Sequence, residues 1–583
     1  MTRRPAPAAR RAARLVATGL LGALALAGCV SVPDRGPVVE TGDSSDVRAG
    51  EAPDIVPQPP QPGESASDVV KHFLEAMRAS PIDTTVARQF LTKDAAASWS
   101  PEQETITYVS NSGPFGSSPT RVKLLDTAHF DARGTWLGPL PTARRTLRFP
   151  LEIEDGEWRI AEAPDALIVN KDWFDQRFQQ VSLFFFDLSG SFLVPEPVFL
   201  PRGNQLPTAL VTGLLAGPPS GLRRVERTFI PPGMTLDLSV PPIDKGVATV
   251  GLSGSGTRVS ADTTTLMLAQ LTWTLRQVPG LQNLKLTMDG QAVGSPGDDG
   301  LPVDSGAEYD PTGWVANATP FGLRRGLLVG DAVDEPTPVT GPFGTKRFGL
   351  RSIAVSPDNT QVAGVTSDGR EAYVTSVSTP DARVATVAPG AADLLPPAWD
   401  LTRRLWLVDR RPSGAVVSVV VDGGAPVAVR APGIDGRRVR AFEVSRDGTR
   451  FVAVVADGAS DAVVVSRVRD RLDGTVALTR AVEIPWPGDT PLRARDLGWS
   501  DPTTAVVLNP LLDRLFEVKA LPLDGSPGRT VATVRGVYRG LVTSPVESEP
   551  SYLVARDGIF ALGDVRTLPG QEGVLLPSLT YVG

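Results

Sequence analysis

The sequence is poor in the residues on which most enzymes, metal sites and disulfide-stabilised domains depend. Its 583 residues include a single cysteine, Cys29, and two histidines, His72 and His129. One cysteine cannot form a disulfide within the chain, so stability must come from hydrophobic cores, which 41% apolar residues can supply. Neither histidine belongs to a metal-ligand spacing, and no G-x-S-x-G nucleophile elbow is present. We therefore predict a protein that is not an enzyme and holds no metal or cofactor. Paired carboxylates of the kind that glycoside hydrolases use remain an alternative, because their separation in space is not encoded in the sequence spacing.

Long apolar runs are also scarce. The run Leu15–Ala27 is followed by no stretch that is long and apolar enough for a transmembrane helix. The formal charge is −7, and the first 28 residues carry five arginines and no acidic residue, so the chain without them has −7 − 5 = −12. Such an acidic protein repels nucleic acid and anionic lipid headgroups. We predict neither as a direct ligand.

The N-terminus has the order of a secretory signal: basic residues, a short apolar run and small residues. It ends in Leu26-Ala27-Gly28-Cys29, which resembles a bacterial lipobox, whose cysteine is acylated and becomes the first residue of the mature protein. Two or more acyl chains, of palmitate or similar fatty acids, hold a protein stably on a membrane. We predict a signal peptide over 1–28, lipidation of Cys29 and a location on the extracytoplasmic side of the cell membrane. The alternative is ordinary signal cleavage beside a chance cysteine.

The segment 29–64 is poor in bulky apolar residues and ends in the proline-rich run Pro57–Gly63. Such a composition cannot bury enough surface to offset the entropy of ordering, and its prolines favour an extended chain. We predict a disordered stalk that lifts the first domain off the membrane.

Residues 65–175 have the pattern of an α+β domain. Ser65 can cap a helix whose apolar face is spaced helically, and His72 falls on the opposite, solvent-facing side. A second helical piece lies around 86–91, and strands are expected at Thr105–Val109, Arg121–Leu125, Thr146–Ile153 and Glu157–Ala161. The helix beginning Ser-Asp-Val-Val-Lys-His-Phe-Leu and the segment Phe90–Trp99 resemble a nuclear-transport-factor-2-like domain.

Residues 179–295 read as strand, helix, two strands, helix, strand. The expected elements are Val181–Phe186, Pro207–Ala216, Thr235–Val240, Val247–Leu252, Asp262–Val278 and Leu284–Met288. Four motifs in this order closely resemble the GerMN domain: Leu215–Pro218, Phe229–Gly233, Val247–Ser253 and Leu286–Gln291. The resemblance implies an α+β domain that binds cell-wall material or protein partners. Pro231-Pro232-Gly233 and Asp289-Gly290 have local turn roles, so none is a candidate ligand residue.

Residues 320–583 are repetitive. Similar turns after alternating strands recur at Asp358, Asp400, Asp447, Asp501 and Pro545, spaced 42, 47, 54 and 44 residues apart. A period of this length with several short strands predicts the blades of an all-β propeller, whereas a β-sandwich would not need turns of one chemistry. A sixth blade is expected from Gly326–Val333 and the final strand Ser578–Val582, so the count is five or six. The aspartates are interpreted as turn formers, not as a carboxylate cluster.

Lipobox, stalk, α+β domain, GerMN domain and propeller occur in the order that is found in the actinobacterial LpqB lipoprotein family, and the resemblance covers essentially the whole chain. It implies a membrane protein that binds the extracytoplasmic part of the sensor histidine kinase MtrB. Through this contact it would modulate phosphorylation of the response regulator MtrA, and with it cell-wall metabolism and division. The alternative hypothesis is an envelope protein that binds peptidoglycan without contacting a kinase.

Overall fold

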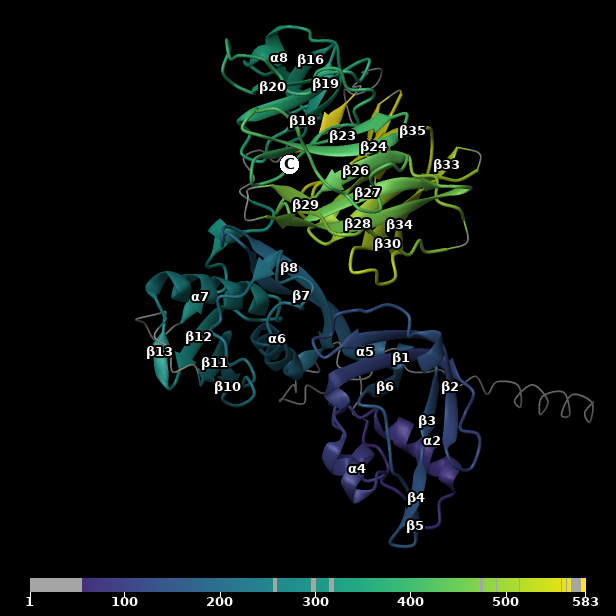
Figure 1. Cartoon of the computed structure of the whole chain (residues 1–583). Helices are drawn as coiled ribbons and strands as arrows, with labels where there is room; N and C mark the ends of the chain where they lie inside the picture. Colours follow the sequence, from purple (N-terminus) through teal and green to yellow (C-terminus); the bar gives the residue numbers. More distant parts are fainter. Residues whose placement is uncertain are drawn as a thin grey trace, which may run out of the picture. The chain divides into compact units, whose positions relative to one another are not determined.

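The structure is a computed structural model (Figure 1). It describes residues 55–254, 259–294, 300–313, 319–471, 475–488, 490–512, 514–556, 558–562, 564–567 and 578–583, with backbone only for 564–567. The chain separates into two units, Met1–Glu51 and Ala52–Gly583, and all structural statements below concern the second. The predicted signal peptide, Cys29 and most of the predicted stalk lie outside the described residues.

The first part of this unit is α+β, as expected. Helix α2 (Ala66–Ala76) begins where predicted, because the Ser65 hydroxyl accepts a hydrogen bond from the Asp68 backbone N–H at 3.2 Å. It buries the apolar face that the spacing predicts, comprising Val69, Val70, Phe73 and Leu74. Two short helices, α3 (Thr85–Arg88) and α4 (Lys93–Ser98), follow it.

A four-stranded sheet in the order β3-β2-β1-β6 shares a core with these helices. Its strands are β1 (Glu104–Asn111), β2 (Thr120–Asp131), β3 (Thr146–Phe149) and β6 (Leu167–Asn170), of which β6 is parallel to β1. The predicted strand Thr146–Ile153 is wrong in its extent, because it breaks at Pro150, which has no N–H to donate. Its second half, β4 (Leu151–Glu154), forms a separate hairpin with β5 (Glu157–Ile160) around Asp155-Gly156, where both φ angles are positive. Helix α5 (Lys171–Arg177), which was not predicted, follows β6.

The second part contains two sheets and two helices. Helices α6 (Leu206–Leu215) and α7 (Ala261–Leu275) pack with a sheet built from β10 (Thr235–Leu236), β11 (Val247–Ser253), β12 (Asn283–Met288), β13 (Gln291–Val293) and β14 (Leu301–Pro302). The expected strand Thr235–Val240 stops at Leu236, since the Val240 N–H donates to the Thr208 hydroxyl at 3.0 Å instead of to a neighbouring strand.

The other sheet has the order β8-β7-β9, with β7 (Phe178–Asp187) between β8 (Leu193–Pro201) and β9 (Glu226–Arg227). Strand β8 was not predicted, because its prolines are unfavourable in most strands. Pro195 pairs with Phe184, and Pro197 pairs with Ser182. Hydrogen-bonded and non-hydrogen-bonded pairs alternate along an antiparallel ladder, and a proline fits only at a non-hydrogen-bonded pair, where its nitrogen and carbonyl point away from β7. The backbone of β8 therefore presents these carbonyl groups at the free edge of the sheet.

Six antiparallel sheets follow among the described residues, each with four or five strands. The first is β17-β16-β15-β39, in which β39 (Leu579–Thr580) pairs with β15 (Phe321–Arg324), so the predicted joining of the two ends is confirmed. Its other strands are β16 (Leu327–Gly330) and β17 (Thr337–Pro338), and the short helix α8 (Pro342–Thr345) leads to the second sheet.

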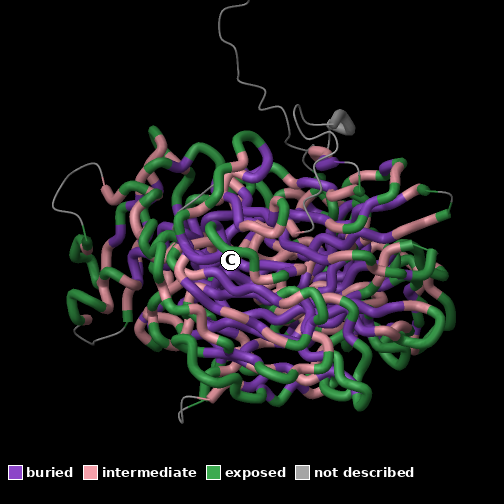
Figure 2. The backbone as a smooth tube through the Cα atoms, turned by 90° about the horizontal axis from the view of Figure 1, so that it is seen from above, coloured by how far each residue is buried: buried purple, intermediate pink, exposed green. Residues whose placement is uncertain are grey.

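The remaining five sheets match the five repeats seen in the sequence. They consist of β18 (Leu350–Val355), β19 (Gln361–Thr366), β20 (Ala372–Ser376) and β21 (Ala385–Thr386); β22 (Ala398–Trp399), β23 (Arg404–Arg411), β24 (Gly414–Val421) and β25 (Val427–Ala428); β26 (Val439–Val444), β27 (Arg450–Asp457), β28 (Ser460–Asp470), β29 (Val476–Leu478) and β30 (Val482–Ile484); β31 (Asp496–Asp501), β32 (Thr504–Pro510), β33 (Leu515–Pro522) and β34 (Arg529–Arg535); and β35 (Tyr538–Val542), β36 (Tyr552–Ala555), β37 (Ile559–Ala561) and β38 (Asp564–Thr567). Figure 2 shows that buried residues run through the interior and that exposed residues gather in the outer turns of the chain.

The recurring aspartates form turns, as predicted. Asp358, Asp447 and Asp501 each accept a hydrogen bond from the backbone N–H two residues later, at 3.1, 2.8 and 2.8 Å. The same contact at Asp400 measures 2.9 Å. These side chains fix the link between the first and second strand of their four sheets, which explains why they recur at the period of the repeat.

Candidate functional site

A central cavity of about 460 Å³ lies between the sheets of the C-terminal region. It is lined by residues at or beside the first strand of each of the five repeats: β18, β22, β26, β31 and β35. Strand β39 lines it on the side of the first sheet. Because all six sheets contribute the same edge, this cavity is the axis around which the repeats are arranged.

Four arginines line the cavity at the beginning of these inner strands: Arg351, Arg440, Arg495 and Arg539. We call this set the arginine mouth. Three of its members are the second residue of their strand (β18, β26 and β35), and Arg495 immediately precedes β31. Since the inner strands carry the arginines at corresponding positions, the four cations gather at one end of the cavity.

Backbone bulges set this placement. The pairing register shifts between Leu350 and Ser352, between Val439 and Ala441, and between Tyr538 and Gly540, so an arginine is the extra residue in three different strands. A bulge breaks the strict alternation of a strand and re-aims one side chain, and bulges of this kind are common beside binding and active sites. The repetition of one bulge with one residue type indicates a built site.

The arginine mouth is only partly neutralised by the protein. Arg351 pairs with Asp393 and Arg440 with Asp461, each at 2.6 Å. Arg495 and Arg539 are exposed, and neither has an ion pair within the described part of the chain. Arg438, which lines an adjoining cavity together with Arg440, is also exposed. A cationic surface therefore faces solvent in a protein whose net charge is −7.

Two carboxyl groups lie further along the same cavity, on β26 and β31. Burial and then the charge of Asp496 raise the pKa of Glu443 well above its ordinary value. Burial likewise raises the pKa of Asp496 to about 6, although its carboxylate accepts the Leu541 and Leu497 N–H groups at 2.8 and 3.0 Å. The Glu443 carboxyl makes no hydrogen bond to any residue that the structure describes. It is therefore available to a ligand.

Arg446 fills the opposite end of the cavity. Its side chain is buried and donates hydrogen bonds to the Val582 carbonyl at 2.6 Å and to the Ser544 hydroxyl at 3.3 Å. Burial lowers its pKa to about 10. The chain end covers it further, because the Gly583 N–H donates to the Val355 carbonyl at 2.9 Å. The arginine mouth is thus the open end of the cavity.

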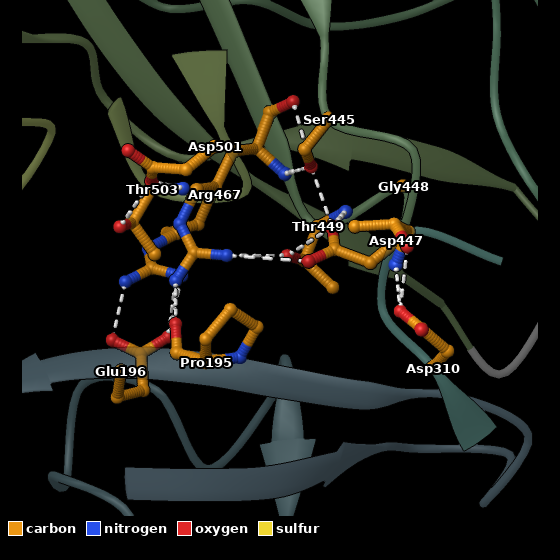
Figure 3. Close-up of polar contacts among 12 residues, drawn as sticks. Pro195, Glu196, Asp310, Ser445, Asp447, Gly448, Thr449, Arg467, Asp501 and Thr503 are labelled. Carbon is orange, nitrogen blue, oxygen red and sulfur yellow. Dashed lines mark hydrogen bonds and ion pairs between the residues drawn. The ribbon is translucent and has the colours of Figure 1, made fainter. Parts of the chain in front are cut away.

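A buried ionic junction joins the edge strand β8 to the C-terminal sheets (Figure 3). The two oxygens of Glu196 accept hydrogen bonds from Arg467 at 2.7 and 2.6 Å, and Oε1 also accepts one from Arg450 at 2.8 Å. Arg450 donates in addition to the Pro195 carbonyl, which lies on the free edge of β8. The proline-containing edge that weakens the strand signal in the sequence is therefore the edge whose carbonyl binds Arg450.

The pKa values of two neighbouring carboxyl groups at this junction are shifted in opposite directions. Burial alone would raise the pKa of Glu196, but the charges of Arg467 and Arg450 outweigh it, so the pKa is lowered and Glu196 is ionised. Glu226, on β9, is almost fully buried, and burial followed by the charge of Glu196 raises its pKa well above the usual value. The junction accordingly favours the charged form of Glu196 and the neutral form of Glu226.

The residues singled out in the sequence are dispersed. His72 is half-buried and pairs with Glu64 at 2.9 Å, so it is not fully solvated as expected, whereas His129 is buried against the Gly138 carbonyl. Leu26, Ala27, Gly28 and Cys29 lie outside the described residues. Among the described residues no group of three or more His, Cys, Asp or Glu side chains could hold a metal, and none of the helices has the length and apolar character needed to cross a membrane.

Sequence reasoning missed the arginine mouth. The signal was present, since the arginines of Leu350-Arg351-Ser352, Val439-Arg440-Ala441 and Tyr538-Arg539-Gly540 each lie five residues before the serine of the turn in their own repeat. Comparing the repeats position by position would have found it. The bulges, which give these arginines their direction, leave no trace in the sequence period.

Comparisons with known proteins cover most of the chain. Family models match residues 59–175 (Lipoprotein LpqB, N-terminal domain), 182–294 (sporulation and spore germination) and 326–559 (Lipoprotein LpqB beta-propeller domain). A protein named Lipoprotein LpqB from Mycobacterium bovis is 30% identical over 606 aligned residues, covering 98% of each chain. Proteins of the same name from Thermobifida fusca and Streptomyces coelicolor are 29% and 28% identical, covering 90% and 89% of this chain and 91% and 89% of their own lengths.

Proposed function

Because this chain belongs to the LpqB lipoprotein family, we propose that it is a membrane-anchored extracytoplasmic lipoprotein that binds the sensor domain of a histidine kinase. Through that contact it modulates two-component signalling that controls cell-wall metabolism and division. The observation that carries the proposal is the arginine mouth, an open cationic surface set by repeated bulges in the central cavity.

The predicted anchor gives this surface its location. Acylation of Cys29 holds the mature chain on the membrane, and the stalk over 29–64 gives reach to the domains over 65–175, 179–295 and 320–583. A partner in the same membrane is met at high local concentration, so contacts of modest affinity suffice. This division into domains is part of the proposal.

A binding role agrees with the chemistry of the cavity. It presents guanidinium groups and two carboxyls of raised pKa, without a nucleophile activated by a neighbouring base. Guanidinium groups recognise carboxylates and phosphates with two parallel hydrogen bonds. We therefore assign recognition to this protein and no catalytic activity.

The test is capture of the kinase's extracytoplasmic domain by the mature chain, solubilised in neutral detergent and immobilised. We expect retention of this domain and no retention of an unrelated sensor domain of similar net charge. Purified cell wall serves as the second probe. Binding to cell wall without binding to the kinase domain would overturn the proposal in favour of the peptidoglycan-binding alternative.

A further inference from the structure

We propose that the arginine mouth binds an acidic polypeptide segment, whose carboxylates are held between arginines of neighbouring inner strands while the segment enters the central cavity. This inference rests on the proposed function, because it names the chemistry of the partner's contact surface. Three features of the cavity support it.

The first feature is the spacing of the cations around a single opening. Arg440 and Arg495 belong to adjacent sheets, as do Arg495 and Arg539, and all line one cavity. Arg495 and Arg539 have no ion pair in the described residues, so their donors are available to an incoming carboxylate. A carboxylate between two such groups can accept charge-assisted hydrogen bonds from both.

The second feature is the size and the wall of the cavity. Its volume of about 460 Å³ suits a short segment of chain and not a folded domain. Between the arginines the wall includes apolar residues such as Pro396, Pro397, Ala441, Leu497 and Val554, beside a similar share of polar surface. Such a wall accommodates the aliphatic parts of a peptide. Because Arg446 and the chain end fill the far end, the segment enters from the arginine mouth.

The third feature is the protonation of the Glu443 carboxyl, which lies deeper in the cavity than the arginine mouth. Burial and the charge of Asp496 raise the pKa of Glu443 well above its ordinary value, so Glu443 keeps its proton at a higher pH than a solvent-exposed Asp or Glu of a partner does. A neutral carboxyl does not repel an anion and can donate a hydrogen bond to it. Glu443 has no hydrogen-bond partner among the described residues, so this donor is unused.

The charge of the whole chain favours a peptide over a long polyanion. The net charge of −7 repels an extended phosphate polymer wherever it leaves the mouth, since charges are felt over about 8 Å at physiological salt. A segment with one or two acidic side chains places its charge only at the arginines. A phosphate polymer is therefore the competing outcome to be tested.

The test is fluorescence anisotropy with the mature chain in neutral detergent and a labelled peptide Gly-Glu-Asp-Glu-Gly, with Gly-Gln-Asn-Gln-Gly as its uncharged counterpart. We expect binding of the acidic peptide alone, weakened about tenfold or more by the double substitution R495Q/R539Q. The matched control R493Q/R535Q removes the same charge at two exposed arginines that do not line the cavity, and should leave binding within about twofold.

Equal weakening by the two double variants, absence of peptide binding, or preferential binding of inorganic polyphosphate would each overturn this inference, whatever the kinase capture shows. Peptide binding that depends on the arginine mouth, combined with failure to capture the kinase domain, would support the inference and reject the proposed partner. Loss of both peptide and kinase domain in R495Q/R539Q alone would support both.

Discussion

Glu196 and Arg467 form a two-point ion pair, Oε1 to Nη1 at 2.7 Å and Oε2 to Nη2 at 2.6 Å, although 271 residues separate them in the chain. Glu196 lies on the edge strand β8 and Arg467 on β28, so the pair joins two parts of the fold that family models match separately. The junction is buried, and its energetics differ accordingly from those of a surface ion pair.

Substituting Glu196 by alanine should lower the free energy of unfolding by about 3–5 kcal/mol, because two arginines are left without their buried partner. Lys93→Ala is the control, since Lys93 and Asp155 form an exposed ion pair at 3.1 Å, which solvent screens and which contributes little to stability. Urea titration of both variants measures the difference. Equal losses would show that the junction contributes no more than a surface pair.

The stability of the protein should depend on pH through Glu443. Its folded pKa is raised, so the folded state holds the proton more tightly than the unfolded chain does. Its stabilising contribution is complete below the unfolded pKa and is lost as pH rises through the folded pKa. Glu443→Gln cannot ionise. The Glu443→Gln variant should have the same midpoint of thermal unfolding as the native protein at pH 4 and a higher midpoint at pH 8. A difference between the two midpoints that does not change with pH would contradict this assignment.

The turn aspartates should differ in how much they contribute to the free energy of unfolding, although they all form the same kind of turn. Asp400 is fully buried and accepts hydrogen bonds from Thr402, the Arg404 side chain at 2.7 Å and the Trp406 indole at 2.8 Å. We expect Asp400→Ala to cost about 3–5 kcal/mol, since the buried Arg404 guanidinium then keeps only the exposed Asp470 carboxylate and the Gly448 carbonyl. Asp358 serves the same turn at a partly exposed position, and Asp358→Ala should cost about 1 kcal/mol. Chemical denaturation of the two variants tests this ranking.

A close backbone approach near α8 should forbid any side chain at Gly344. A Cβ there would lie 1.9 Å from the Val339 carbonyl oxygen, so the backbone must move to admit it. Gly344→Ala should lower the midpoint of thermal unfolding by several degrees, on the order of a 2–3 kcal/mol loss. Gly221→Ala, where a Cβ meets nothing within 4 Å, should leave the midpoint unchanged. An unaffected Gly344→Ala protein would count against the described path of the chain there.

The membrane anchor is predicted to depend on one thiol. Since Cys29 is the only cysteine, Cys29→Ala should abolish incorporation of labelled palmitate and release the protein from the membrane fraction. Metabolic labelling followed by fractionation measures both effects. Label retained by the variant would exclude Cys29 as the acylation site.

Much of the fold could be predicted from local signals in the sequence. The helix at Ser65 and the turns at Asp358, Asp447 and Asp501 depend on side chains that bond their own neighbouring backbone, so short segments encode them. Strand β8 could not be predicted in this way, because its prolines are acceptable only at the free edge of a sheet, a property of its neighbours.

The candidate site was hidden for a related reason. Within its own repeat, each arginine of the arginine mouth has the sequence context of an ordinary surface residue. The four lie together only because the repeats are arranged around one cavity. The bulges that aim them arise from strand pairing, which the hydrophobic period does not record.

The pairing of Phe321 with Thr580 has a consequence for biosynthesis. A ribosome must add nearly 260 residues after Phe321 before its partner exists, so the opening sheet of this region stays incomplete until the chain has been made as far as β39. A stop codon before β39 would leave β15 with a bare edge ready to recruit another chain, so β39 also protects the protein against aggregation.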